Sequence, residues 1–223
     1  MNEGKLNKAD TKPITVLLVD DHPVVRDGYR RLLENTPDIR VVAEADDGET
    51  GCAHYKEYAP DVVILDLSMP GIGGLETIRR IKAQHPEARI LIFSMHGSET
   101  MIQRVLEAGA AGYLTKKSGM GQMVAAVRQV ARGELFIEAE QAVSMALRKQ
   151  SPSSEEPLHM LSKREFQLFK LLAEGCSSSE IAATLSISPK TVGVHHANIM
   201  KKLKLQNTAQ IVRLALRNNI IEP

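Results

Sequence analysis

Residues 62–74 read VVILDLSMPGIGG, and this stretch decides the fold. Four consecutive apolar residues run directly into Asp66, which is followed by a turn rich in Pro and Gly. An apolar run without alternation is typical of a strand buried on both faces of a parallel sheet. Similar short runs occur at residues 14–19, 39–43, 90–93 and 112–114. We therefore expect five buried parallel strands in the first half of the chain.

Segments of helical length and period separate these runs, among them residues 24–33, 75–84, 100–108 and 120–132. Five strands that alternate with five helices predict a doubly wound α/β domain over residues 14–133. We expect the flavodoxin-like strand order 2-1-3-4-5, in which the first and third strands are neighbours. Residues 1–13 form a polar tail before this domain.

The second half of the chain differs in charge and in pattern. Residues 1–159 contain 19 Lys and Arg against 23 Asp and Glu, whereas residues 160–223 contain 9 against 4. No strand pattern occurs after residue 160, so residues 160–223 predict a small all-α domain. Its net positive charge favours a polyanionic partner. Between the domains, residues 134–159 predict a linker with a possible helix at 138–148, because residues 150–157 contain three Ser, two Glu and two Pro.

Composition also indicates the cellular compartment of the protein. Cys52 and Cys176 are the only cysteines in the sequence, which excludes a disulfide framework and favours a reducing environment. No stretch of about 18 apolar residues is present, so we expect no membrane span and a place in the cytoplasm of a prokaryote.

Acidic residues gather where the expected strands end. Asp20 and Asp21 follow the first strand and Asp66 follows the third, so the order 2-1-3-4-5 places three carboxylates in one crevice. Two unit charges about 4 Å apart repel by roughly 4 kcal/mol at an effective dielectric near 20, and a single lysine, Lys116, cannot neutralise three carboxylates. Hard oxygen ligands favour Mg²⁺. Taken singly, each acidic residue could instead be a solvated loop residue or a helix cap.

These residues resemble the receiver domain of two-component systems over about 120 residues. Asp20-Asp21 matches the acidic pair of that family, and residues 66–71 with Gly74 match its phosphoacceptor signature D-x-x-M-P-x-x-x-G. Ser94 matches the switch hydroxyl at the end of the fourth strand, and Tyr113 matches the aromatic switch position shortly before Lys116.

The resemblance implies that Asp66 accepts a phosphoryl group from a sensor histidine kinase. It implies that Asp21, Asp66 and the backbone carbonyl of Ser68 hold Mg²⁺, while Asp20 acts through water. It also implies that Lys116 and Ser94 contact phosphoryl oxygens, and that Tyr113 turns into the space that Ser94 leaves. Such a protein is a phosphoacceptor regulator and no enzyme beyond its own autophosphorylation and autodephosphorylation.

Three helix starts follow in the basic domain. Ser162 with Glu165 and Ser177 with Glu180 fit capping boxes, and Ser188 precedes a Pro at the first helical position. In the third helix one stripe, Val192, His196, Ile199 and Leu203, has the spacing of a core face.

A second stripe of the third helix carries small side chains between lysines, as suits a helix in a DNA major groove. It consists of Lys190, Val194, Ala197 and Lys201, with Thr191 and Asn198 beside it. Such a stripe is also compatible with a merely solvated helix face. Residues 161–165, Gly175, residues 180–182 and residues 188–195 resemble the LuxR-type helix-turn-helix, a likeness that extends over about 60 residues. The whole chain therefore resembles a NarL/FixJ-type response regulator that dimerises on DNA through a last helix near residues 208–218. Gly193 departs from relatives that often have a lysine there.

Three alternative functions can be compared with these residues. A haloacid-dehalogenase-type phosphatase would require a second Asp two residues after the nucleophile, where this chain has Ser68. A flavin-binding domain would require a phosphate-cradling first loop, from which Asp20 and Asp21 would repel the phosphate. DNA binding that is independent of phosphorylation is compatible with every residue named here. The opposite charges of the domains also permit the receiver to dock over the DNA-reading helix, although the linker permits other arrangements.

Overall fold

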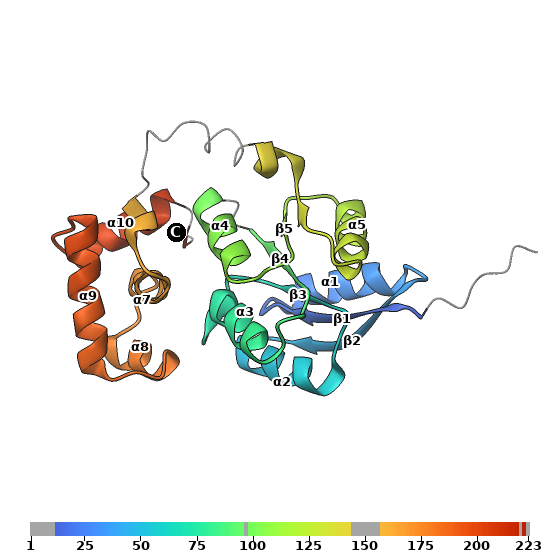
Figure 1. Cartoon of the computed structure of the whole chain (residues 1–223), viewed down its shortest axis with the longest axis horizontal. Helices are drawn as coiled ribbons and strands as arrows, with labels where there is room; N and C mark the ends of the chain where they lie inside the picture. Colours follow the sequence, from blue (N-terminus) through green and yellow to red (C-terminus); the bar gives the residue numbers. More distant parts are fainter. Residues whose placement is uncertain (1–11, 96–97, 144–156, 219, 222–223) are drawn as a thin grey trace, which may run out of the picture.

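The computed structural model describes residues 12–95, 98–143, 157–218 and 220–221. Its first half is a six-stranded, entirely parallel sheet in the order β2-β1-β3-β4-β5-β6 (Figure 1). The predicted fold class and the predicted order of the first five strands are therefore confirmed. Most of the polar tail and all of residues 150–156 lie outside the described residues.

Each of the first five strands is followed by a helix, and the sixth strand follows the fifth helix. The elements are β1 (Ile14–Val19), α1 (Pro23–Glu34), β2 (Ile39–Ala45), α2 (Gly48–Tyr58), β3 (Val62–Leu65), α3 (Gly73–Gln84), β4 (Ile90–Ser94), α4 (Glu99–Glu107), β5 (Gly112–Thr115), α5 (Met120–Ala131) and β6 (Phe136–Ile137).

The sheet is buried on both faces, which explains why its strands are continuously apolar. Alternate side chains of β3 point to opposite sides: Val63 and Leu65 pack in one cluster with α2, α3 and α4, while Val62 and Ile64 pack in another with α1 and α5. All four of these side chains are buried. Burial of this kind fixes the register, because a slip by one residue would exchange the two faces.

The sixth strand was not predicted. Phe136 and Ile137 pair with Gly112 and Tyr113 of β5, so the chain after α5 returns to the sheet edge. Two residues are too few to produce a recognisable apolar run. The possible helix begins at Ala139 and is helical through Val143, and its expected remainder to residue 148 lies outside the described residues.

The second half is helical, as predicted. A short 3₁₀ helix, η1 (Pro157–Met160), precedes α7 (Lys163–Ala173), α8 (Ser178–Thr184), α9 (Pro189–Leu203) and α10 (Thr208–Arg217). Both expected capping boxes are formed, and the Ser188 side chain caps α9 with Pro189 in its first turn. Among the described residues, no helix combines the length and the apolar character needed to cross a bilayer.

The close approach of β6 to β5 generates a stability prediction. A Cβ on Gly112 would lie 2.9 Å from the carbonyl oxygen of Phe136, and backbone there cannot move without breaking the edge pairing. We expect Gly112→Ala to lower the free energy of unfolding by about 1–3 kcal/mol, the usual cost of overpacking. Urea denaturation followed by circular dichroism measures this.

Gly121→Ala is the matched control, because nothing lies within 4 Å of a Cβ at that position in α5. It should be neutral or stabilising by up to about 1 kcal/mol, since Ala is the better helix former. Equal stabilities of the two variants would show that β6 does not constrain Gly112.

Candidate functional site

The carboxyl ends of β1 and β3 bring the predicted acidic residues together. The two strands are paired with Val19 opposite Leu65, and the Asp66 amide continues the ladder by donating to the Val19 carbonyl at 2.9 Å. Asp20 and Asp66 are both buried, with 7% and 2% of their surface exposed. Because β1 and β3 are neighbours, Asp20 and Asp66 lie side by side although they are 46 positions apart in the sequence.

Lys116, which directly follows β5, bridges the two buried carboxylates. Its Nζ donates to Asp20 Oδ2 at 2.6 Å and to Asp66 Oδ2 at 2.7 Å. Burial lowers the pKa of Lys116, but the Asp66 and Asp20 carboxylates outweigh it, so the pKa lies above its ordinary value of 10.5. The ammonium is therefore charged at neutral pH, and its stabilising interaction is lost only as pH rises through that raised pKa.

The acidic cluster has the composition of a site for a hard cation. Single ligand atoms of Asp20, Asp21, His22 and Asp66 all lie within 4.8 Å of one another. Asp21 Oδ1 is buried and has no hydrogen-bond partner among the described residues, although the His22 Nδ1 lies 2.9 Å from it. Three carboxylates facing one ammonium leave an excess of negative charge, so the donor set fits Mg²⁺.

The turn after Asp66 is fixed by the glycine at the end of the signature. A Cβ on Gly74 would lie 2.3 Å from the Asp66 carbonyl oxygen, so no other residue permits this approach of α3 to the turn. Within the turn the Ser68 amide donates to Asp66 Oδ1 at 3.2 Å, which orients the carboxylate. Ser68, Asp66 and Lys116 all line one cavity at the mouth of the site.

Ser94 and Tyr113 lie next to each other at the ends of β4 and β5. Both side chains are fully buried, and the Ser94 hydroxyl hydrogen-bonds that of Tyr113. Burial raises the pKa of Tyr113 above its usual range, so the phenol stays neutral. The two residues that were predicted as a switch pair are thus already in direct contact.

Sequence reasoning missed Glu138, which lies just after β6. Its Oε2 accepts from the Thr115 amide at 3.0 Å, and its Oε1 accepts from the Ser118 hydroxyl. These bonds fix both sides of the loop that carries Lys116. No local motif marks Glu138, because its role depends on the unpredicted edge strand.

The predicted DNA-facing stripe of α9 is open to solvent. Lys190, Ala197, Asn198 and Lys201 are exposed, and 55% of Val194 is exposed. On the opposite face Val192, Ile199 and Leu203 are buried and His196 is partly buried.

Thr191 and Gly193 differ from the rest of α9 in what they offer to a partner. The Thr191 hydroxyl lies 2.8 Å from that of Ser188, so the helix cap uses it, and the side chain is only partly exposed. Gly193 is exposed with open space around it, so packing does not require a glycine there.

The receiver does not dock over α9, an arrangement that the opposite charges of the domains permitted. The polar contacts between the domains join α3, α4 and the turn after Asp66 to η1 and α7 (Figure 1). Helix α9 lies on the side of the second domain that is remote from the sheet.

Comparisons with known proteins agree with this geometry. The model for the response regulator receiver domain matches residues 16–128, and the model for bacterial regulatory proteins of the luxR family matches residues 159–215. The response regulator UvrY of Escherichia coli is 39% identical over 208 residues, which cover 93% of this chain and 95% of UvrY. The response regulator GacA of Pseudomonas aeruginosa is 36% identical over 210 residues, covering 94% and 98%.

A solved structure of the RcsB response regulator of Salmonella typhimurium matches 91% of this chain and 96% of its own, with a TM-score of 0.74 and 28% identity. A receiver joined to a helix-turn-helix domain defines a class of transcription regulators. The chain belongs to the two-component response regulators of the NarL/FixJ type.

The lysine bridge generates a prediction for stability and cation binding. Lys116→Met leaves two buried carboxylates without their counter-charge, which typically costs about 3–5 kcal/mol. We expect the variant to unfold at lower urea concentration than the wild type, and MgCl₂ to restore more stability to the variant than to the wild type, because a bound cation stabilises the folded state.

Lys117→Met is the control, since Lys117 is the exposed neighbour of Lys116. It should unfold like the wild type with and without MgCl₂. Equal stability of Lys116→Met and the wild type in the absence of MgCl₂ would contradict the assigned role of the bridge.

Proposed function

We propose that the chain is a phosphorylation-controlled transcription factor. A receiver domain over residues 14–133 accepts a phosphoryl group on Asp66, and a helix-turn-helix domain over residues 160–223 binds DNA as a homodimer, with residues 134–159 between them. The single observation that carries this proposal is the bridge of Lys116 between Asp66 and Asp20 beside a third carboxylate.

The proposed transfer moves a phosphoryl group from the histidine of a sensor kinase to Asp66. The N–P bond to histidine breaks while an O–P bond forms to an Asp66 carboxylate oxygen, so the product is an acyl phosphate. Such a reaction depends mainly on positioning and on stabilising charge on the phosphoryl oxygens. Lys116 already lies 2.7 Å from an Asp66 oxygen and would pair with one phosphoryl oxygen.

The other residues of the site would hold the metal ion or respond to the phosphoryl group. Asp21, Asp66 and the Ser68 carbonyl would hold Mg²⁺, with Asp20 acting through water. The ion would neutralise the charge that accumulates around the phosphoryl group. Ser94 would leave its bond to Tyr113 to donate to a phosphoryl oxygen, which frees the buried phenol to take a second position.

The DNA contacts would come from the exposed stripe of α9, with Lys190 and Lys201 at its ends as phosphate contacts and Val194, Ala197 and Asn198 facing base edges. Thr191 would add a further contact to DNA once its hydroxyl leaves the bond to Ser188. A structure of RcsB of Salmonella is described as bound to a promoter in the presence of a beryllofluoride phosphomimetic, at 26% identity and a TM-score of 0.71. Because the proposed partner is DNA, we infer that the protein is cytoplasmic.

A second function keeps the architecture but makes DNA binding independent of phosphorylation. The exposed stripe of α9 favours it, because the receiver does not cover the DNA-reading face. A phosphatase is disfavoured, since Ser68 stands where the second aspartate would be required.

Asp66→Asn tests the phosphoacceptor directly. The amide keeps the shape of the side chain but lacks the nucleophilic charge, so we expect no mass increase when the protein is treated with acetyl phosphate and Mg²⁺. Asp61→Asn is the control, because Asp61 bonds Thr15 at the other end of the sheet and should leave labelling unchanged. A persistent mass shift in Asp66→Asn would remove Asp66 from the role.

Lys190→Ala tests the DNA interface. Loss of one phosphate contact should weaken binding at all sequences and reduce the slope of log affinity against log salt by about 1. Arg132→Ala removes the same charge from the receiver surface and should change neither quantity; fluorescence anisotropy with a labelled duplex measures both. An unchanged salt slope in Lys190→Ala would exclude this contact.

A further inference from the structure

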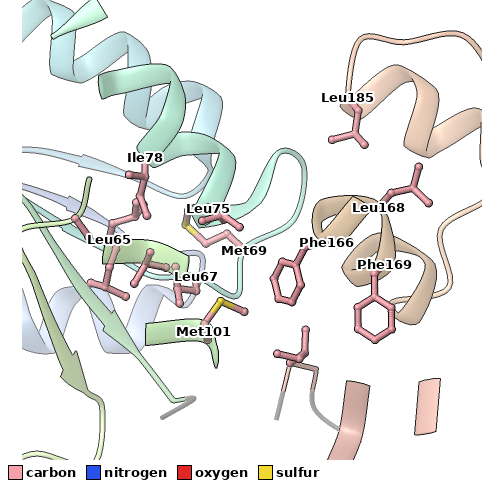
Figure 2. Packing of buried hydrophobic residues seen from close by; sticks show 14 of the residues in the cluster. Leu65, Leu67, Met69, Leu75, Ile78, Met101, Phe166, Leu168, Phe169 and Leu185 are labelled. Atoms are coloured by element: carbon pink, nitrogen blue, oxygen red, sulfur yellow. The ribbon is translucent and has the colours of Figure 1, made fainter. Parts of the chain in front are cut away.

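Two segments from outside the first five α/β units reach the acidic site. Helix α7 packs near the turn after Asp66, where Figure 2 shows Phe166 facing Met69 and Met101. At the edge of the sheet, β6 pairs with β5 and is followed at once by Glu138. Since β4 separates β3 from β5 in the sheet, the two segments contact different parts of the site.

Glu138 binds the loop that carries Lys116 at two points. Its Oε2 accepts from the Thr115 amide at 3.0 Å, and its Oε1 accepts from the Ser118 hydroxyl. The hydroxyls of Thr115 and Ser118 lie 2.8 Å apart, and the Ser118 amide donates to the Thr115 carbonyl at 3.0 Å. The two residues that flank Lys116 and Lys117 are thus joined both to each other and to Glu138.

The end of β5 is held from both sides. The Lys116 amide donates to the Ser94 carbonyl of β4 at 2.9 Å, whereas the preceding amide, that of Thr115, donates to Glu138. A charged carboxylate is a stronger acceptor than a backbone carbonyl. Because β6 has only two residues, the Glu138 side chain supports the end of β5 where the strand itself does not reach.

Backbone support at Lys116 matters most while the site is reacting. At rest the Lys116 Nζ is held by Asp20 at 2.6 Å and by Asp66 at 2.7 Å. Under the proposed function the Nζ leaves Asp66 for a phosphoryl oxygen, and Asp66 as an acyl phosphate no longer offers its full charge. Ordering a lysine side chain costs up to about 2 kcal/mol, so a backbone that is already fixed favours the new contact.

We propose that Glu138 is a positioning residue for phosphoryl transfer to Asp66. It fixes the loop of residues 115–118, so that the Lys116 Nζ lies where the phosphoryl oxygens arrive. This inference rests on the proposed function of Asp66. It gives residues 134–159, the segment after the receiver domain, a direct part in setting the rate of the transfer.

The test compares Glu138→Ala with Glu138→Gln in the full chain. Alanine removes both hydrogen bonds, whereas the glutamine carbonyl can still accept from the Thr115 amide and its NH₂ can donate to the Ser118 hydroxyl. With saturating acetyl phosphate and Mg²⁺, we expect Glu138→Ala to be labelled about tenfold more slowly than the wild type, since misplaced catalytic groups cost factors of this order. Glu138→Gln should be labelled at nearly the wild-type rate.

Two further observations separate positioning from a loss of folding. The half-saturating Mg²⁺ concentration should not rise in Glu138→Ala, because the proposed metal ligands follow β1 and β3 and not β5. Ser118→Ala removes only one of the two bonds, so its rate should lie between those of Glu138→Ala and the wild type. This variant also provides the test if Glu138→Ala does not fold, as judged by circular dichroism.

A second readout follows Lys116 without any phosphoryl donor. The side chain of Lys116 is 7% exposed, whereas its neighbour Lys117 is exposed and serves as the internal reference. Reductive methylation of the native protein, mapped by mass spectrometry, should modify Lys116 faster relative to Lys117 in Glu138→Ala. The ratio should stay at the wild-type value in Glu138→Gln.

Glu140→Ala is the matched control, because it removes the same charge from an exposed position two residues further along. It should behave as the wild type in both measurements. Wild-type labelling of Glu138→Ala would overturn the inference, as would a Glu138→Gln variant that is as slow as Glu138→Ala. A wild-type chain that takes no label would instead overturn the proposed function, while an unchanged methylation ratio in Glu138→Ala would overturn the positioning of Lys116 by Glu138.

Discussion

The structure depends on one electrostatic constraint, the meeting of three carboxylates with a single ammonium at the edge of the sheet. Lys116 spans Asp20 and Asp66 with two short bonds, and beside them a buried Asp21 oxygen has no hydrogen-bond partner among the described residues and lies 2.9 Å from the His22 Nδ1. The site is therefore stable enough to form and still has an excess of negative charge. That excess favours a divalent cation, and under the proposed function the cation and Lys116 together would supply the charge that an incoming phosphoryl group requires.

Parallel pairing is what creates this constraint, and it explains which parts of the fold could be predicted from the sequence. The runs at Ile14–Val19 and Val62–Leu65 were predicted to the residue, because burial on both faces makes a strand apolar throughout and an aspartate ends each run abruptly. The cluster follows from the order of the strands alone. The helix caps Ser162, Ser177 and Ser188 were equally predictable, since capping is local chemistry.

The features that sequence reasoning missed are those that depend on contacts between distant segments. Strand β6 has two residues and exists because β5 offers a free edge, and Glu138 acquires its role from that edge. Nothing near Arg104 in the sequence distinguishes it from an arginine on a solvated helix face. Only the packing of η1, Leu161 and α7 against α4 gives it two carbonyls and an aromatic ring as partners.

The position of α9 limits how such a chain can be controlled. The lysines of its stripe are exposed while the domains are docked, so the receiver does not cover that face. In the docked state Val212 and Leu216 of α10 line the same cavity as Asp66. If dimerisation through the last helix supports binding to two half-sites, then holding α10 against the receiver weakens DNA binding without any contact to the DNA-reading surface.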